Sequence, residues 1–245
     1  MTAPAWLKST PVAHRGLHDP AAGIPENSLA AFTAAIAGGY AFELDVRLSR
    51  DGIAIVFHDG KLKRLTGRPG TLEDHTAADL AKLTLLGTGE TIPSLAEVLA
   101  LTAGRAPVLI EVKAFGFEAV GPLEAAVARA LDGYKGPFAV QSFSPQTVAW
   151  FERQAPDFCR GQIATDPAAA SELPPERQQA RARQIDQAIG APHFVAYDVR
   201  YLPAPLTERA RRDGLPVLTW TVRSAQDWQR ARRHADNPIF EGWRP

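Results

Sequence analysis

This sequence has one cysteine, no net charge and no long hydrophobic run, and each absence excludes a class of protein. Cys159 is the only cysteine in 245 residues, so no internal disulfide can form and nothing indicates an oxidising compartment. Lys plus Arg and Asp plus Glu number 27 each, which gives no overall field toward nucleic acid or an anionic membrane. No apolar run approaches the ~18 residues that span a bilayer, and the N-terminus lacks a signal-peptide pattern. We therefore expect a soluble, cytoplasmic protein without a nucleic-acid partner or membrane insertion.

What the sequence does contain is an alternation of short β-branched runs with longer amphipathic ones. The short runs predict strands at 11–14, 40–46, 107–113, 137–143, 159–163, 193–199, 216–222 and 238–242. The longer runs predict helices at 26–39, 94–103, 118–132, 145–154, 170–190, 205–213 and 224–234. Strands that are each followed by a helix, except the last, close most naturally as a parallel (β/α)8 TIM barrel, with a doubly wound open sheet as the alternative. We expect one domain over residues 1–245.

A further apolar run, 53–58, follows the second strand too closely to be its parallel neighbour. Only Ser49 to Gly52 separates the two runs, whereas a parallel crossover needs a dozen or more residues. The sequence therefore predicts an antiparallel hairpin that brings His58 back toward the second strand. An insertion of about 59–93 follows, with a short helix expected near 76–83, and a connection of that length is more often functional than passive.

Charged residues stand where the first three predicted strands end, and in barrels of this class the C-terminal strand ends carry the chemistry. The residues at these positions are His14, Arg15, Glu43, Asp45, His58, Glu111 and Lys113. Side chains two positions apart point to the same side of a strand. If those sides face the mouth of the barrel, the three carboxylates converge with the two histidines and the two cations.

Three converging carboxylates repel one another unless a cation neutralises them. Oxygen ligands suit one divalent cation, Mg²⁺ or Ca²⁺, whereas zinc prefers nitrogen and sulfur. Arg15 and Lys113 add positive charge, so we expect an anionic substrate such as a phosphate. His14 and His58 can divide proton transfer, one accepting from a nucleophile and one donating to a leaving oxygen. The set predicts metal-assisted phosphodiester cleavage.

Each of these residues alone has an ordinary structural explanation. A histidine after a strand is usually a hydrogen-bonded loop residue, Glu43 and Asp45 suit an edge strand, and Glu111 with Lys113 suits an internal ion pair. Their joint occurrence at successive strand ends weakens that explanation. Trp220 is a core residue by default, and packing against the substrate is the alternative for it.

The motifs resemble the glycerophosphodiester phosphodiesterase family. The family pattern of HR, then E-x-D, then HD appears here in order, within the segments AHRG, PENSLAAF, ELDVRLSRDG, VFHDGKLKRLTG, IPSLAEVL, IEVK, VQSFSP and TWTV. The likeness runs from about residue 11 to the C-terminus, strongest over 11–113 and thin over 155–210. It implies a phospholipase-C-like (β/α)8 barrel that hydrolyses glycerophosphodiesters to sn-glycerol 3-phosphate and an alcohol.

The resemblance also implies a role for each residue of the set. It makes Glu43, Asp45 and Glu111 the metal ligands, His14 and His58 the general acid and base, and Arg15 and Lys113 the phosphate contacts. The mechanism that it suggests uses the glycerol 2-hydroxyl as internal nucleophile, through a cyclic phosphate that water opens. Glu241 stands where the family often has a Thr-Asp pair, and no role is assigned to it.

Two other functions stay open at this point. A lysophospholipase D-type enzyme needs an apolar rim for the acyl chain, to which 59–75 and 114–118 contribute only Leu62, Leu65, Leu72, Phe115 and Phe117. A non-catalytic phosphate-binding barrel would not need both histidines. The alcohol, the ion, the division of roles between the histidines and the oligomeric state are not fixed by the motifs.

Overall fold

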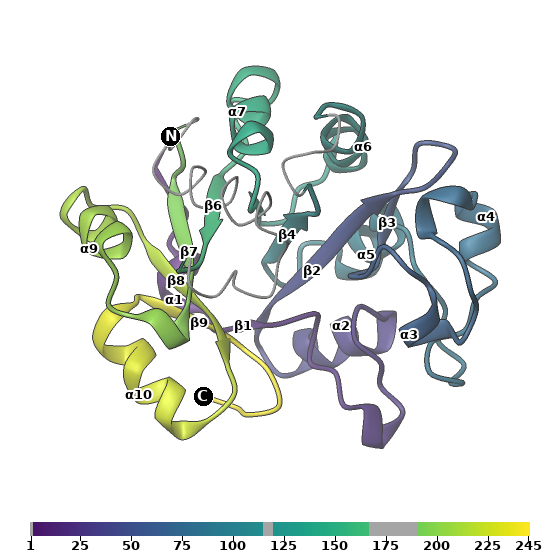
Figure 1. Ribbon diagram of the computed structural model, residues 1–245, viewed down its shortest axis with the longest axis horizontal. Coiled ribbons are helices and arrows are strands. Elements are labelled where there is room, and N and C mark those ends of the chain that lie inside the picture. Colours follow the sequence, from purple (N-terminus) through teal and green to yellow (C-terminus); the bar gives the residue numbers. More distant parts are fainter. Residues whose placement is uncertain (1, 115–119, 167–190) are drawn as a thin grey trace. The chain divides into compact units, whose positions relative to one another are not determined.

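The computed structural model describes residues 2–114, 120–166 and 191–245. Strands and helices alternate along the chain (Figure 1), and the fold is of the (β/α)8 barrel class, as predicted. The helix expected over 170–190 lies outside the described residues. The described chain divides into two compact units, of which the first is Val12–Lys113 with Gly121–Phe138. A single domain over 1–245 stays a prediction.

The first unit is built on a strand with parallel neighbours on both sides and a hairpin at its end. Its strands are β1 (Val12–Ala13), β2 (Ala41–Leu48), β3 (Ala54–Val56) and β4 (Val108–Val112). β1 and β4 run parallel to β2, while β3 runs antiparallel to it. Gly52 takes φ 79° in the connection, and Ser49 N donates to Ile53 O at 2.9 Å. The predicted hairpin is confirmed.

In its described residues the first unit has four helices outside the insertion, of which three begin at a side chain that caps free N–H groups and the last begins at Gly121, which has no such side chain. They are η1 (Pro20–Ala22), α2 (Leu29–Ala37), α5 (Leu95–Thr102) and α6 (Pro122–Leu131). Ser28 caps α2 by accepting from Ala31 N at 3.1 Å. α2 lies on β2 through Phe32 and Phe42, whose ring centroids are 4.7 Å apart. The helix predicted over 26–39 therefore begins after Ser28.

The insertion after β3 has a hydrophobic core of its own. It contains α3 (Lys63–Thr66), η2 (Leu72–Asp74) and α4 (Ala77–Leu80). The short helix predicted near 76–83 is confirmed as α4, whereas α3 and η2 were not predicted. The insertion's buried side chains pack with those of β3 in a cluster of Ile55, Phe57, Leu62, Leu65, Leu72, Leu80, Leu85 and Ile92. The insertion is therefore a packed element and not a loose loop.

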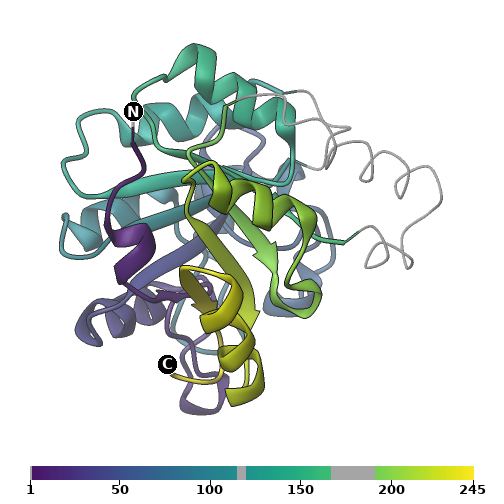
Figure 2. The same ribbon diagram turned by 90° about the vertical axis from the view of Figure 1, so that its left-hand side faces the viewer.

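The second unit is a run of parallel neighbours in chain order. Its strands are β5 (Phe138–Ser142), β6 (Arg160–Ala164), β7 (Phe194–Asp198), β8 (Val217–Val222) and β9 (Asn237–Phe240). Its helices are α1 (Trp6–Ser9), α7 (Pro145–Gln154), η4 (Val199–Tyr201), α9 (Pro205–Arg212) and α10 (Ala225–His234). The last two, green and yellow in Figure 2, pack on β7–β9. α1 was not predicted, and every predicted strand is confirmed to within a residue or two.

Among the helices of the described ranges, none combines the length and the apolarity needed to cross a bilayer.

Candidate active site

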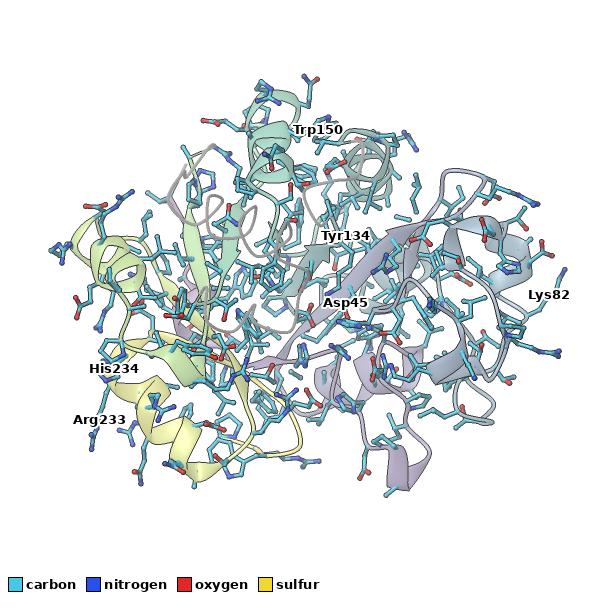
Figure 3. All side chains as sticks on the ribbon, in the orientation of Figure 1. Asp45, Lys82, Tyr134, Trp150, Arg233 and His234 are labelled. Atoms are coloured by element: carbon cyan, nitrogen blue, oxygen red, sulfur yellow. The ribbon has the colours of Figure 1, made fainter. Side chains whose placement is uncertain are left out.

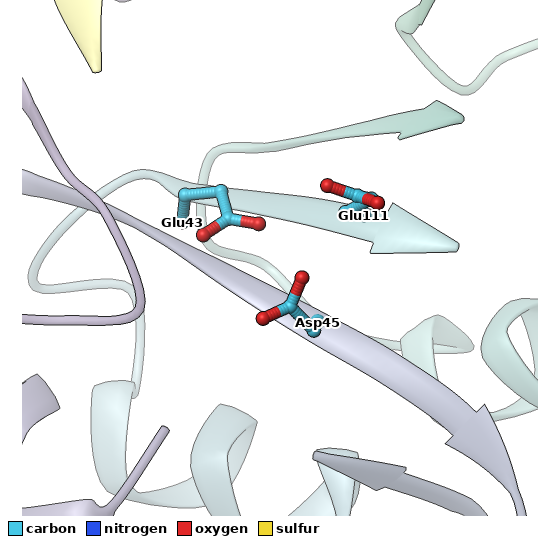
Figure 4. A group of neighbouring side chains, drawn as sticks. All are labelled: Glu43, Asp45 and Glu111. Atoms are coloured by element: carbon cyan, nitrogen blue, oxygen red, sulfur yellow. The ribbon is translucent and has the colours of Figure 1, made fainter. Parts of the chain in front are cut away.

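Three carboxylates converge between the neighbouring strands β2 and β4 (Figure 4). Glu43 and Asp45 lie two residues apart on β2, where Figure 3 labels Asp45, and Glu111 is opposite Asp45 on β4. One oxygen of each carboxylate lies within 4.8 Å of the others, and all three residues are buried. Period-two alternation and parallel register therefore bring together the acids that the sequence singled out.

Burial and repulsion set the protonation of these acids. Burial raises the pKa of Glu43 well above its usual value, and the charges of Asp45 and Glu111 raise it further. Burial also raises the pKa of Glu111, against the opposing charge of Lys113. For Asp45, burial is outweighed by Lys113 and Arg15, which hold its pKa below the ordinary range. The site thus holds more buried carboxylates than its own cations neutralise.

The acids present an oxygen that suits a divalent cation. Glu43 Oε1 is buried and accepts no hydrogen bond from the described parts of the chain, whereas buried polar atoms are normally paired. Carboxylate oxygens are the ligands that Mg²⁺ and Ca²⁺ prefer, with water or substrate completing the shell. The three acids therefore fit a divalent cation.

Two cationic side chains flank the acids. Lys113 Nζ lies 2.8 Å from Asp45 Oδ1 and donates to Glu111 Oε1 at 2.5 Å. Arg15 places Nε 3.3 Å from Asp45 Oδ2, and its backbone N donates to Glu43 Oε2 at 3.0 Å. Burial alone would lower the pKa of Lys113, but Asp45 and Glu111 raise it above its usual value. Both predicted phosphate contacts therefore lie beside the acids as fixed positive charges.

A tight turn after β1 brings Arg15 to this position. Arg15 and Gly16 take φ 56° and 79°, and Gly16 N donates to Glu43 O at 3.2 Å. A Cβ on Gly16 would stand 2.8 Å from Ala31 Cβ on α2. The turn therefore needs glycine for both its backbone angle and its closeness to the helix.

Gly16→Ala is expected to lower the free energy of unfolding by roughly 2 kcal/mol or more, since strain at positive φ adds to overpacking. Urea denaturation measures it. Gly23→Ala is the matched control, because Gly23 has φ 73° and nothing within 4 Å of its Cβ position. Equal losses in the two variants would show that the contact with α2 does not matter.

Asn27 is a site residue that the sequence analysis did not identify. It is buried with φ 55°, its Nδ2 donates to Asp45 Oδ2 at 2.8 Å, and its Oδ1 accepts from Asp45 N at 3.3 Å. Asn27 therefore fixes the orientation of the Asp45 carboxylate. Its contact with Asp45 depends on tertiary packing, because the two residues are 18 positions apart.

The two histidines reach the site from β1 and from the hairpin. His14 Nε2 lies 4.0 Å from Glu43 Oε2, and His58 Nδ1 lies 2.7 Å from Asp59 Oδ1. Burial lowers the pKa of His58 to about 4, with Asp45 opposing this effect. Because the Asp59 carboxylate only accepts hydrogen bonds, Nδ1 of His58 carries the proton and Nε2 keeps its lone pair.

Trp220 lies on β8 in the second unit. Its ring meets Phe143 edge to face, with centroids 5.5 Å apart. The buried indole Nε1 has no hydrogen-bond acceptor within the described segments. Contact of Trp220 with substrate stays a prediction. Glu241 accepts from Arg223 Nη2 at 2.8 Å, which gives it an ion-pair partner.

Comparison with known protein families and sequences finds relatives along nearly the whole chain. The model of the glycerophosphoryl diester phosphodiesterase family matches residues 14–240. A glycerophosphodiester phosphodiesterase of Caldanaerobacter subterraneus subsp. tengcongensis is 26% identical over 235 residues, which are 91% of this chain and 90% of the relative. A glycerophosphodiester phosphodiesterase of Bacillus subtilis is 27% identical over 89% of this chain and 78% of the relative.

Solved structures share the same fold. The crystal structure of a glycerophosphodiester phosphodiesterase from Thermotoga maritima matches with a TM-score of 0.71 and 25% identity, covering 94% of each chain. An Oleispira antarctica phosphodiesterase in complex with the product sn-glycerol-3-phosphate matches with a TM-score of 0.74 and 24% identity, covering 94% of this chain and 91% of the other. The predicted fold class is confirmed.

Proposed function

Because this chain belongs to the glycerophosphoryl diester phosphodiesterase family, we propose that its buried acid–cation site hydrolyses glycerophosphodiesters with one divalent cation and two histidines. The chain is an enzyme of that hydrolase class. The observation that carries the proposal is the convergence of Glu43, Asp45 and Glu111 with Arg15 and Lys113. The expected products are sn-glycerol 3-phosphate and an alcohol. The structure of the Oleispira antarctica phosphodiesterase, which contains sn-glycerol-3-phosphate as product, supports this expectation.

The three acids would hold the cation, Mg²⁺ or Ca²⁺, which when bound supplies positive charge next to the phosphoryl oxygens. Arg15 and Lys113 bind the phosphate oxygens directly and hold the diester against the acids. Two cationic side chains also stabilise the charge that develops on those oxygens in the transition state. A glycerol 2-hydroxyl that attacks within the same molecule avoids the entropy cost of recruiting a separate nucleophile.

The histidines divide the proton transfers. His58 is neutral at pH 7 with a free lone pair on Nε2, which is the state that a general base requires. We assign it to take the proton of the glycerol 2-hydroxyl. His14, beside Glu43, then gives a proton to the leaving alcohol oxygen, which leaves a cyclic phosphate. Water opens this ring with the two roles reversed: His14 takes a proton from the water, and His58 returns its proton to the glycerol 2-oxygen, which gives glycerol 3-phosphate.

The His58 ring is expected to titrate near pH 4 in the metal-free protein, because burial disfavours the imidazolium. The neutral form therefore persists as the pH falls from 7 and is lost only as the pH passes through about 4. NMR titration of the ring, assigned by comparison with His58→Gln, measures the midpoint. A midpoint near 6.5 would contradict the burial effect.

Product release from a substrate panel tests the function. Glycerophosphocholine, glycerophosphoethanolamine, glycerophosphoglycerol, glycerophosphoinositol and lysophosphatidylcholine are each incubated, with Mg²⁺ or Ca²⁺ present, with the wild type and with His14→Ala. We expect release of glycerol 3-phosphate from at least one glycerophosphodiester, lost in the variant. No release from any of them, with the protein folded, would refute the proposal. The alcohol that is preferred follows from the same panel.

The structure weakens the lysophospholipase D alternative. Leu62, Leu65 and Leu72 are 0%, 3% and 0% exposed within the core of the insertion, so they cannot line an acyl-binding rim. Phe115 and Phe117 lie outside the described residues. Faster turnover of lysophosphatidylcholine than of glycerophosphocholine would reverse this ranking, and tight ligand binding without turnover would favour a phosphate-binding barrel.

A cytoplasmic location is a further proposal from the sequence.

A further inference from the structure

One arginine of the insertion donates hydrogen bonds to two carboxylates. Arg64, on α3, donates from Nη1 and Nη2 to the two oxygens of Glu26, both at 2.8 Å. The same guanidinium donates from Nε to Asp59 Oδ2 at 2.6 Å and from Nη2 to Asp59 Oδ1 at 3.1 Å. Forked contacts of this kind fix the direction of a carboxylate as well as its distance.

Each of the two carboxylates holds a different member of the site on its other side. Glu26 Oε1 accepts from Arg15 Nη1 at 2.8 Å, and Asp59 Oδ1 lies 2.7 Å from His58 Nδ1. One chain of contacts therefore runs from Arg64 through Glu26 to Arg15, and another from Arg64 through Asp59 to His58. The residue for phosphate binding and the residue for proton transfer meet at one guanidinium.

The charges in both chains favour the same arrangement. Burial would raise the pKa of Glu26 and of Asp59, but hydrogen bonds from Arg64 outweigh it and lower both. Both carboxylates therefore stay ionised and accept hydrogen bonds. Ionised Asp59 keeps the proton of His58 on Nδ1, and ionised Glu26 shares its charge between Arg15 and Arg64.

The backbone around Arg64 is fixed by the core of the insertion. Its neighbour Leu65 and the preceding Leu62 are buried in that core, and Leu65 O accepts from Leu86 N at 2.6 Å. Gly67, with φ 71°, ends α3. An exposed ion pair on a mobile side chain contributes little, but here a packed helix and two forked contacts hold the guanidinium in place.

We propose that Arg64 is a positioning residue that orients Arg15 through Glu26 and His58 through Asp59. This inference rests on the roles proposed above for Arg15 and His58. It also gives the insertion after β3 a function: its core fixes one side chain that reaches both halves of the site. Kinetics can distinguish the two chains of contacts, because the one through Glu26 acts on substrate binding and so on KM, and the one through Asp59 acts on proton transfer and so on kcat.

Arg64→Gln is expected to raise KM and lower kcat, each by about tenfold or more, since small misplacements of a catalytic group can cost up to ~100-fold. Glu26→Gln is expected to raise mainly KM, and Asp59→Asn to lower mainly kcat. In a double variant that combines Arg64→Gln with either change, the loss of kcat/KM should be smaller than the product of the two separate fold-losses. Arg64→Lys, which cannot fork to both carboxylates, should recover only part of the loss.

Arg68→Gln is the matched control, because Arg68 is an exposed arginine four residues further along the insertion. It should leave both kinetic constants at their wild-type values. Two readouts need no turnover: the glycerol 3-phosphate affinity by calorimetry, and the protonated nitrogen of His58 in ¹H–¹⁵N NMR spectra. Arg64→Gln should weaken the first and turn the single Nδ1–H form of the second into a mixture.

Any one of three results would overturn the inference. The first is that the kcat and KM of Arg64→Gln equal those of Arg68→Gln. The second is that Arg64→Gln lowers only the melting temperature, and the third is that it changes neither the His58 tautomer nor the glycerol 3-phosphate affinity. A wild type that turns over no glycerophosphodiester would instead refute the proposed function, and the two readouts without turnover would still decide the role of Arg64.

Discussion

His58→Ala is expected to lower kcat by roughly 10²- to 10⁴-fold, the usual contribution of a general acid or base. The reason is that His58 has a free Nε2 lone pair and a pKa of about 4, whereas alanine cannot accept the proton of an attacking hydroxyl. The imidazole of His58 makes its hydrogen bond with Asp59, which is not one of the three converging acids. The affinity of the variant for Mg²⁺ or Ca²⁺ should therefore change little. Steady-state kinetics with glycerophosphocholine and a metal titration followed by calorimetry measure both quantities.

The control for this variant is His75→Ala, which removes another imidazole from the insertion. His75 makes its backbone contacts through N and O, so its ring can be removed without breaking them. We expect wild-type kcat in this control. If His58→Ala kept full kcat, the assignment of proton transfer would be wrong even though the family is right. If it lost the metal as well, His58 would belong to the metal site.

Glu43→Gln is expected to abolish metal binding without destabilising the metal-free protein. Glutamine has the size of glutamate but no charge, and burial already disfavours the ionised form of Glu43. A ligand at 100 times its Kd adds about 2.7 kcal/mol to the free energy of unfolding, so Mg²⁺ or Ca²⁺ should raise the melting temperature of the wild type only. The turnover should fall with the metal affinity.

Thermal unfolding with EDTA, with Mg²⁺ and with Ca²⁺ makes this comparison. Glu208→Gln, on the exposed part of α9, is the control and should keep the metal-dependent shift. A Glu43→Gln protein that still gains stability from either ion would remove Glu43 from the ligand set. A metal-free variant much less stable than the wild type would show that Glu43 has a structural role as well.

The acid–cation set could be predicted because it follows from local rules. Glu43 and Asp45 share a side of β2 through alternation, and Glu111 lies opposite Asp45 through the register of parallel neighbours. The hairpin followed from a connection too short for a crossover. Alternation and the hairpin depend on a few consecutive residues, and the approach of Glu111 to Asp45 needs only that the second and third parallel strands of a barrel are neighbours.

The residues that support the set could not be predicted, because tertiary packing brings them together. Arg64 and Glu26 are 38 positions apart, and their contact depends on how the insertion packs. Asn27 directly precedes the N-cap of α2, and its left-handed backbone turns its side chain to Asp45. The contact of the Trp220 ring with Phe143 likewise joins residues far apart in the sequence, so the sequence does not reveal it.

The measurement that tests the central claim most directly is the hydrolysis of glycerophosphocholine followed by ³¹P NMR, with EDTA and after Mg²⁺ or Ca²⁺ is added back. If the buried acids hold a cation that the reaction needs, the diester signal stays unchanged in EDTA and converts to the glycerol 3-phosphate signal once the metal returns. Conversion at full rate in EDTA, or no conversion by a protein that calorimetry shows to have bound the metal, would contradict the account.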